Sequence, residues 1–194
     1  MAFTPVYPIE TQRLRLRPFT RGDVDAVHDY RRRDDVTRYL YDEPMSRESC
    51  TEAVQTRIGQ ISIENDDDRL FLAVERQDDL AVLGEVCLIL RSASSRQAEL
   101  GYTFNPVFHG RGYATEAALA LLAIGFEAAG MHRIYARCHA LNAASRRVME
   151  RLGMRQEAHL REHLFVKGAW DEELIYALLE DEWRARQATE QNTL

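Results

Sequence analysis

One stretch decides the fold: Glu99-Leu100-Gly101-Tyr102-Thr103-Phe104-Asn105-Pro106-Val107-Phe108-His109-Gly110-Arg111-Gly112-Tyr113-Ala114-Thr115-Glu116-Ala117. Aromatic and β-branched residues at 102–104 favour a strand, and Pro106 ends it because proline cannot donate to a strand ladder. From Tyr113 onward the apolar residues recur at helical spacing. The stretch therefore predicts a β-strand, a turn that contains two glycines, and the start of a long helix.

The glycine turn predicts an anion-binding site. Gly110 and Gly112 lack a Cβ, which lets several backbone N–H groups converge on one point. A helix that begins there adds unpaired N–H donors and a partial positive charge, which suit a phosphate or pyrophosphate. The Lys-Ser/Thr pair of a P-loop is absent, and Thr115 stands where a Rossmann fingerprint needs its third glycine. An ordinary strand-to-helix turn is the alternative at this point.

Composition restricts the class of protein. The 194 residues are 45% hydrophobic and 29% charged, which fits a single soluble domain with a proper core. A formal charge of −6 tells against direct nucleic-acid binding and favours a cationic partner. The three cysteines are far apart in the sequence, which indicates reduced thiols and a cytoplasmic location. No apolar signal core opens the chain and no apolar run approaches the ~18 residues of a membrane span, so no membrane partner is expected.

Hydrophobic periodicity, together with turn and helix-capping residues, predicts the remaining elements of a mixed α/β domain spanning 1–188. A disordered tail is predicted at 189–194. The arginines of the first strand, which alternate with leucines, are expected on a solvated face. Thr20 and Ser46 are placed to begin the first two helices, and Asn142 is placed to cap the fourth. The predicted strands are 13–17, 69–75, 83–90, the one containing Glu99, 132–139, 155–166 and 171–178; the predicted helices are 22–34, 46–63, 113–129, 142–152 and 180–187.

Three motifs, in order along the chain, resemble the GNAT superfamily of N-acetyltransferases. The family's acyl-CoA loop, Arg/Gln-x-x-Gly-x-Gly/Ala, has its counterpart at 109–114, with His109 in place of the first Arg or Gln. The longer run to Ala117 is similar to the Rim-type branch, which acetylates ribosomal-protein N-termini. The segment 142–154 resembles the family's Asn-x-x-Ser helix, and 166–183 resembles the closing hairpin of the Rim type.

The resemblance implies a fold, a co-substrate and site residues. The fold is a single GNAT-type domain whose central, mostly antiparallel sheet of about seven strands is splayed at the cofactor site and flanked by helices. Acetyl-CoA is the implied co-substrate, and no metal is required. In the related branch a serine matching Ser145 is proposed to protonate the departing thiolate, although a first-turn serine also serves as a capping partner. The residues assigned to acetyl-CoA are Tyr102, Thr103, Phe104, His109, Gly110, Arg111, Gly112, Tyr113, Ala114, Asn142 and Arg147.

Glu99 is the candidate general base. Period two places it on one strand face with Gly101 and Thr103, beside the implied donor site. A partly buried carboxylate there could draw a proton from the incoming ammonium, directly or through water. An α-amine with a pKa of about 8 is roughly one-tenth neutral at pH 7 and needs less help than a lysine. A salt-bridged glutamate is the alternative.

Three functional hypotheses remain open from the sequence. The first is an N-acetyltransferase that acts by direct attack on a protein N-terminal α-amine or a small amine. The others are a catalytically silent acyl-CoA-binding module and a generic nucleotide-binding domain. The connection 37–44 is a candidate lining of the acceptor mouth through Tyr39 and Tyr41. The oligomeric state, monomer or homodimer, is open.

Overall fold

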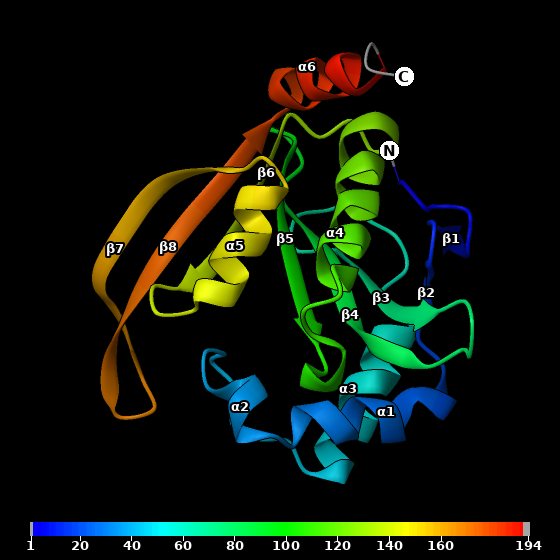
Figure 1. Ribbon diagram of the computed structural model, residues 1–194, viewed down its shortest axis with the longest axis vertical. Coiled ribbons are helices and arrows are strands. Elements are labelled where there is room, and N and C mark those ends of the chain that lie inside the picture. Colours follow the sequence, from blue (N-terminus) through cyan, green and yellow to red (C-terminus); the bar gives the residue numbers. More distant parts are fainter. Residues whose placement is uncertain (1, 192–194) are drawn as a thin grey trace.

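The computed structural model describes residues 2–191, and its strands form one mixed sheet with helices on both faces (Figure 1). The strand order is β1-β2-β3-β4-β5-β6-β8-β7, and every neighbouring pair is antiparallel except β5 and β6. The mostly antiparallel sheet is confirmed, with eight strands because the two-residue β1 joins one edge. The strands are β1 (Ile9–Glu10), β2 (Leu14–Pro18), β3 (Arg69–Arg76), β4 (Val82–Ser92), β5 (Gln97–Phe104), β6 (Arg133–His139), β7 (Arg155–Val166) and β8 (Ala169–Leu179).

Two helices begin where the sequence places their N-caps, whereas the predicted helix 22–34 is a 3-10 turn followed by an α-helix that ends at Arg31. The side chains of Ser46 and Asn142 accept hydrogen bonds from the amides three residues further on, as N-caps do. The last helix extends to Gln191, and the rest of the predicted tail, 192–194, lies outside the described residues. The helices are η1 (Arg21–Asp23), α1 (Val24–Arg31), α2 (Asp34–Thr37), α3 (Arg47–Ile58), η2 (Pro106–Phe108), α4 (Tyr113–Ala123), the π-helical η3 (Ile124–Ala128), α5 (Ala143–Arg151) and α6 (Glu180–Gln191).

The predicted end of the second helix is wrong. Helix α3 ends at Ile58 and not at Ile63, because Gly59 follows it as C-cap and the chain then joins the sheet. Ile61 bridges Leu70, and Ile63 bridges Phe3. The apolar residues that extend the helical pattern therefore lie in extended chain at the edge of the sheet.

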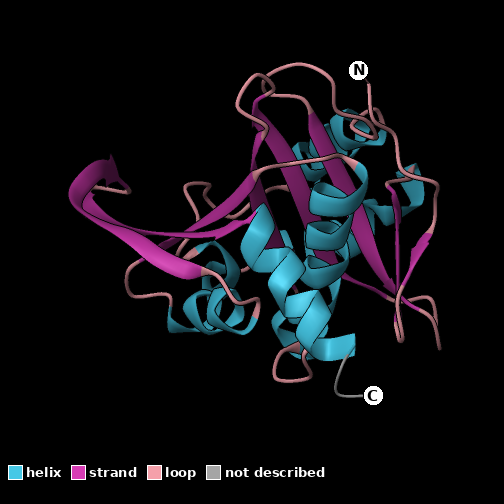
Figure 2. Cartoon of the chain, turned by 90° about the horizontal axis from the view of Figure 1, so that it is seen from above, coloured by secondary structure: helices cyan, strands magenta, loops and turns pink. Residues whose placement is uncertain are grey.

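Alternation along the strands divides the core into two layers. On β3, Leu70, Leu72 and Val74 pack into the large core beneath α4. Ala73 packs into the smaller core beneath α1 and α3, and Phe71 borders that core. Period two thus places helices on opposite faces of one strand. The hairpin of β7 and β8 leaves this layered body and projects to one side (Figure 2).

The sheet splits between β5 and β6, as the resemblance implies. These parallel strands pair only where 97–99 meet 133–135. Beyond that point β5 stays paired with β4 as far as Phe104, whereas β6 follows β8 (Figure 1). The edge of β5 that faces away from β4 is therefore left without a strand partner from Leu100 onward.

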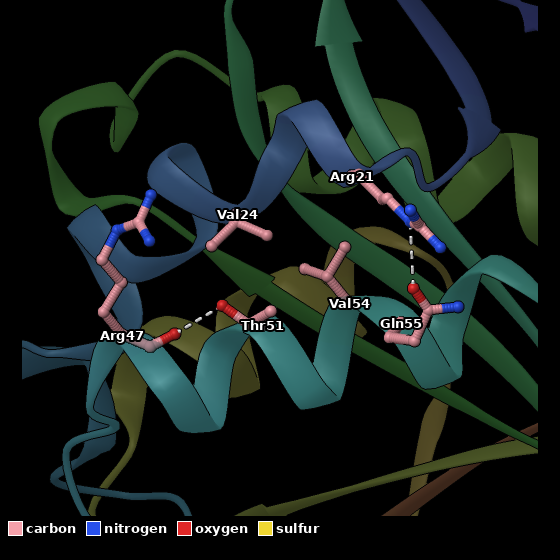
Figure 3. Close-up of a pocket in the computed structure, with 6 residues that line it drawn as sticks. All are labelled: Arg21, Val24, Arg47, Thr51, Val54 and Gln55. Carbon is pink, nitrogen blue, oxygen red and sulfur yellow. Dashed lines mark hydrogen bonds between the residues drawn. The ribbon is translucent and has the colours of Figure 1, made fainter.

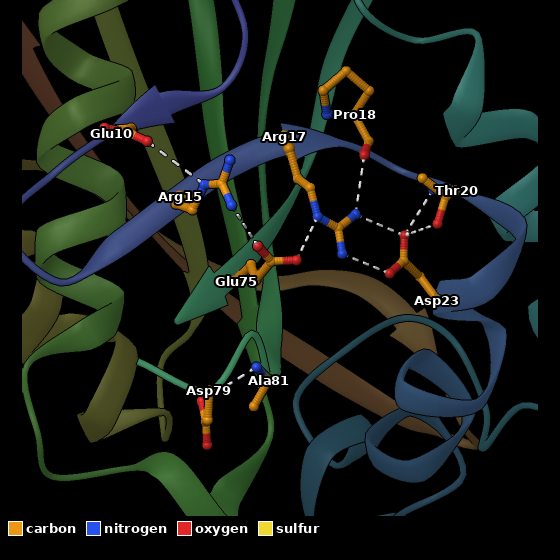
Figure 4. Close-up of polar contacts among 9 residues, drawn as sticks. All are labelled: Glu10, Arg15, Arg17, Pro18, Thr20, Asp23, Glu75, Asp79 and Ala81. Atoms are coloured by element: carbon orange, nitrogen blue, oxygen red, sulfur yellow. Dashed lines mark hydrogen bonds and ion pairs between the residues drawn. The ribbon is translucent and has the colours of Figure 1, made fainter. Parts of the chain in front are cut away.

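The arginines of β2 are partly exposed, but the sequence did not predict that carboxylates pair with them on that face. Arg17 donates to Glu75 at 2.7 Å and to Asp23 at 2.8 Å (Figure 4). Arg15 lies 3.6 Å from the other oxygen of Glu75. Burial alone would raise the pKa of Asp23, but the hydrogen bonds from Arg17 outweigh burial and lower it. The alternation predicts the strand correctly, whereas the carboxylates that pair with it come from β3 and η1.

A buried ionic cluster joins the sheet to α1 and α3. Glu85 of β4 is 1% exposed, accepts hydrogen bonds from Tyr30 at 3.0 Å and Arg57 at 2.7 Å, and is also paired with Arg31. Burial alone would raise the pKa of Glu85, but the two guanidinium groups lower it. The carboxylate is therefore ionised, and its negative charge compensates the buried guanidinium groups of Arg31 and Arg57.

We expect Glu85→Ala to destabilise the fold by about 3–5 kcal/mol, because it leaves two buried guanidinium groups without their shared carboxylate. Urea unfolding followed by circular dichroism measures the change. The matched control is Asp25→Ala, which breaks the exposed pair with Arg47 and should cost less than about 1 kcal/mol. A loss for Glu85→Ala no larger than the control's would contradict the prediction.

Candidate active site

The turn before α4 presents a row of unused backbone donors. Gly110 and Gly112 adopt φ values of +76° and +80°, which glycine reaches at little cost. Among residues 2–191, nothing accepts a hydrogen bond from the amides of the six consecutive residues from Gly110 to Thr115. The first bond of the helix runs from the Glu116 amide to the Gly112 carbonyl at 3.0 Å. The loop and helix start thus present the unpaired donors that the predicted anion site requires.

His109 secures the start of this loop. Its Nε2 lies 3.1 Å from the carbonyl oxygen of Phe104, the last residue of β5. This contact connects the end of the strand to the loop through a side chain. The histidine at the family's Arg/Gln position therefore has a structural partner within the chain.

A side-chain cluster that the sequence did not reveal holds the start of α4 against the β1–β2 turn. Glu116 accepts hydrogen bonds from Thr11 at 2.6 Å and from the Nε of Arg13 at 2.7 Å. Arg13 also donates to the carbonyl of Arg111 at 3.1 Å and lies 4.6 Å from the centre of the Tyr113 ring. The same arginine thus contacts both the loop and the first turn of the helix.

A cavity of about 210 Å³ lies where β5 and β6 separate. It brings together six of the predicted site residues from separate parts of the sequence, namely Tyr39, Glu99, Tyr102, Thr103, Asn142 and Ser145. It also contains residues that the sequence analysis missed. Those that bear on its chemistry are Arg31, Glu85, Cys87, Arg137 and Cys138.

Hydrogen bonds orient Ser145 in this cavity. Its amide donates to the Asn142 side chain at 3.0 Å, so Asn142 is the N-cap of α5. The Tyr102 hydroxyl lies 3.0 Å from the Ser145 carbonyl oxygen and 2.8 Å from Ser145 Oγ. If the tyrosine donates to the carbonyl, the serine hydroxyl donates to the tyrosine. Burial raises the pKa of Tyr102, which keeps its hydroxyl protonated.

Glu99 is held by positive groups. It is 9% exposed, and its two oxygens accept hydrogen bonds from Arg91 at 2.8 Å and Arg137 at 2.9 Å. The Tyr135 hydroxyl is a further donor at 3.4 Å. The carboxylate therefore lies in the cavity as a paired ion, with its position fixed from β4 and β6.

Several predicted residues lie outside the cavity. Tyr41 instead donates to the buried Glu173 of β8. Arg111 and Arg147 are exposed, and neither has an ion-pair partner within the described residues. Tyr113 is 9% exposed and packs in the core, so it can offer a ligand only its amide.

The cavity thiols are not nucleophiles. Burial raises the pKa of Cys87 to about 12 and that of Cys138 to about 11, so both are neutral at physiological pH. Gly101 lies against Cys87, because a Cβ at that position would stand 2.8 Å from the sulfur. Within 2–191 there is no group of three or more potential metal-binding side chains.

A second hollow lies among the helices of the N-terminal part of the chain. It measures about 390 Å³ and is lined from η1, α1 and α3 by residues such as Arg21, Val24 and Gln55 (Figure 3). None of the predicted site residues lines it. This hollow therefore shares no lining residue with the cavity at the β5–β6 fork.

Comparison with known proteins decides the family. Residues 13–155 match the family model described as an acetyltransferase (GNAT) domain. The chain belongs to the GNAT family. It is 33% identical to the N-acetyltransferase YnaD of Bacillus subtilis over 175 residues, 90% of this chain and 98% of YnaD. A GNAT-family acetyltransferase from Bacillus anthracis, whose crystal structure is known, matches with a TM-score of 0.81 and 31% identity over 89% of this chain and 98% of its own.

Two further relatives are named for their acceptors. The spermidine N(1)-acetyltransferase of Escherichia coli K12 is 26% identical over 93% of this chain and 94% of its own length. YdaF of Bacillus subtilis, provisionally named a ribosomal N-acetyltransferase, is 35% identical over 54% of this chain and 57% of its own length. The GNAT chain described here is thus an acetyl-CoA-dependent N-acetyltransferase with relatives of the Rim type.

The residues of this GNAT enzyme fit acetyl-CoA. The six unused amides from Gly110 to Thr115 suit a diphosphate, and the unpartnered edge of β5 suits the amide-containing pantetheine arm. Thr115 Oγ1 is also buried without a partner in the described part of the chain. When bound, acetyl-CoA supplies an acetyl thioester, which is the acyl donor.

Proposed function

We propose that this GNAT enzyme acetylates the α-amine of a protein N-terminus or a small primary amine by direct attack on the thioester. The observation that carries the proposal is the cavity at the β5–β6 fork, which places Glu99 and Ser145 beside the free edge of β5. A new C–N bond replaces the C–S bond, and one proton passes from nitrogen to sulfur overall. The enzyme needs to align the amine and manage that proton.

We assign the proton transfers to two residues. Glu99, directly or through water, receives the proton that the acceptor nitrogen loses. Glu99 later releases that proton to solvent. Ser145 donates a proton to the departing thiolate and recovers one from solvent by way of the Tyr102 hydroxyl, which lies 2.8 Å away and is itself reprotonated. These are proposals for roles, and the geometry that supports them is the shared cavity lining.

A panel of amines tests the proposal. Release of the CoA thiol is measured with acetyl-CoA and an N-terminal peptide, a small monoamine, spermidine and a lysine side-chain analogue. We expect turnover with at least one α-amine or small primary amine. CoA binding without thiol release for any amine would instead support the catalytically silent module.

No helix within 2–191 is long and apolar enough to cross a membrane. A cytoplasmic location and the choice between monomer and homodimer stay predictions.

A further inference from the structure

Arg31 is a cavity residue whose hydrogen bonds are incomplete. It lines the cavity and is 6% exposed. Its Nη2 donates to Glu85, but its buried Nε has no acceptor among the described residues. Its Nη1 has only Asp42, at 3.7 Å, which is too long for a hydrogen bond. A buried guanidinium nitrogen without an acceptor, as Nε is here, is rare in a folded protein, because lost hydration must be replaced by acceptors.

The carboxylates of the cavity, in contrast, are already satisfied. Glu85 and Glu99 are the two acidic residues among the described cavity lining. Each is paired with two arginines, Glu85 with Arg31 and Arg57 and Glu99 with Arg91 and Arg137. Neither carboxylate of the described lining is therefore left unpaired for the second ammonium group of a polyamine.

Arg31 lies near one end of the part of β5 that lines the cavity. Its partner Glu85 lies opposite Thr103 in the β4–β5 register, whereas Glu99 lies four residues back along β5. At about 3.4 Å per residue, these points are about 14 Å apart. Arg31 therefore serves the α1 end of the cavity and Glu99 the opposite end, with Tyr102 and Gly101 on the strand between them.

We propose that Arg31 is a specificity-determining residue that binds an oxygen on the carbon next to the acceptor amine, so that the preferred acceptor is an α-amino carbonyl compound and not a polyamine. This inference rests on the proposed function. An sp² oxygen supplies the acceptor that the guanidinium lacks. The same chemistry occurs in the first peptide carbonyl of a protein N-terminus and in the carboxylate of a free amino acid.

Two variants separate recognition from support of the fold. Arg31→Met removes the proposed contact. Arg57→Met is the matched control, because Arg57 pairs with the same Glu85 at 2.7 Å but does not line the cavity. CoA affinity, measured by calorimetry, reports whether each variant remains folded at the donor site. Arg31→Lys, which keeps the charge, should recover part of the lost affinity.

Initial rates are measured for each protein with alaninamide, an amidated trialanine peptide, free alanine, ethylamine and spermidine. We expect Arg31→Met to raise the KM for alaninamide at least about tenfold and to leave that for ethylamine within about twofold. Arg57→Met should change the KM for alaninamide and the KM for ethylamine by the same factor. The peptide and free-alanine arms identify which source of the carbonyl oxygen the enzyme prefers.

The inference is overturned if Arg31→Met changes the KM of ethylamine and alaninamide equally, if Arg57→Met reproduces the selective loss, or if the unaltered enzyme prefers spermidine. Failure of the proposed function has a different signature, since the unaltered enzyme then releases no thiol with any amine, and this inference falls with it. If Arg31→Met does not bind CoA, the KM values of Arg31→Lys for alaninamide and ethylamine are compared with those of the unaltered enzyme. A selective rise for alaninamide supports the inference, and an equal change for both amines overturns it.

Discussion

Replacing Gly112 by valine is expected to weaken CoA binding by about 10²-fold or more. Gly112 has a φ of +80°, and an L-residue in this region costs about 1–2 kcal/mol, with a β-branched side chain at the high end. Relief of this strain rotates the backbone and turns neighbouring amides away from their common point. Hydrogen bonds to a charged group contribute about 1.5–3 kcal/mol each, so losing two gives the expected factor. Calorimetric titration with CoA measures the change.

Gly130→Val is the matched control. Gly130 follows the same helical segment, has a φ of +67° and has no atom within 4 Å of a built Cβ. It therefore carries the same kind of backbone strain at the opposite end of the α4–η3 segment. We expect it to lower stability and to leave CoA affinity within about twofold. Equal CoA affinities for the two variants would mean that the amides of Gly110 to Thr115 do not hold the diphosphate.

The features predicted from the sequence are those that local chemistry encodes. Gly110 and Gly112 mark the anion loop because their backbone needs no distant partner, and Asn142 marks a helix start because it caps its own helix. Helix α3 shows the limit of such patterns. Its apolar spacing continues past Gly59, but Ile61 and Ile63 form β-bridges with Leu70 and Phe3 and so are extended, not helical.

The residues that were missed depend on partners far along the chain. Glu116 meets Arg13 across 103 positions, and Glu85 meets Arg31 across 54. An alternating strand shows that a residue faces the core, but it does not show which guanidinium pairs with it there. Glu85 therefore gave no signal in an otherwise apolar strand. The ion pairs of Glu99 could not be predicted for the same reason.

Replacing Glu99 by glutamine is expected to lower kcat/KM by about 10²-fold at pH 7, the typical contribution of a general base. The amide keeps the shape of the side chain and can still accept from Arg137, but it cannot take a proton. CoA affinity should be unchanged, because the anion loop lies at the other end of β5. Stopped-flow detection of the released thiol gives the rate, and calorimetry gives the affinity.

The pH profile distinguishes a base from a residue that only positions Arg137. An α-amine with a pKa of about 8 is almost fully neutral at pH 9.5, where little proton removal before attack is needed. If Glu99 removes that proton, the deficit of Glu99→Gln should shrink as the pH rises from 7 to 9.5. A constant deficit would instead mean that the carboxylate acts through its ion pairs. Glu173→Gln is the matched control, since buried Glu173 lies 3.5 Å from the same Arg137 but outside the cavity, and it should not reproduce the loss at pH 7.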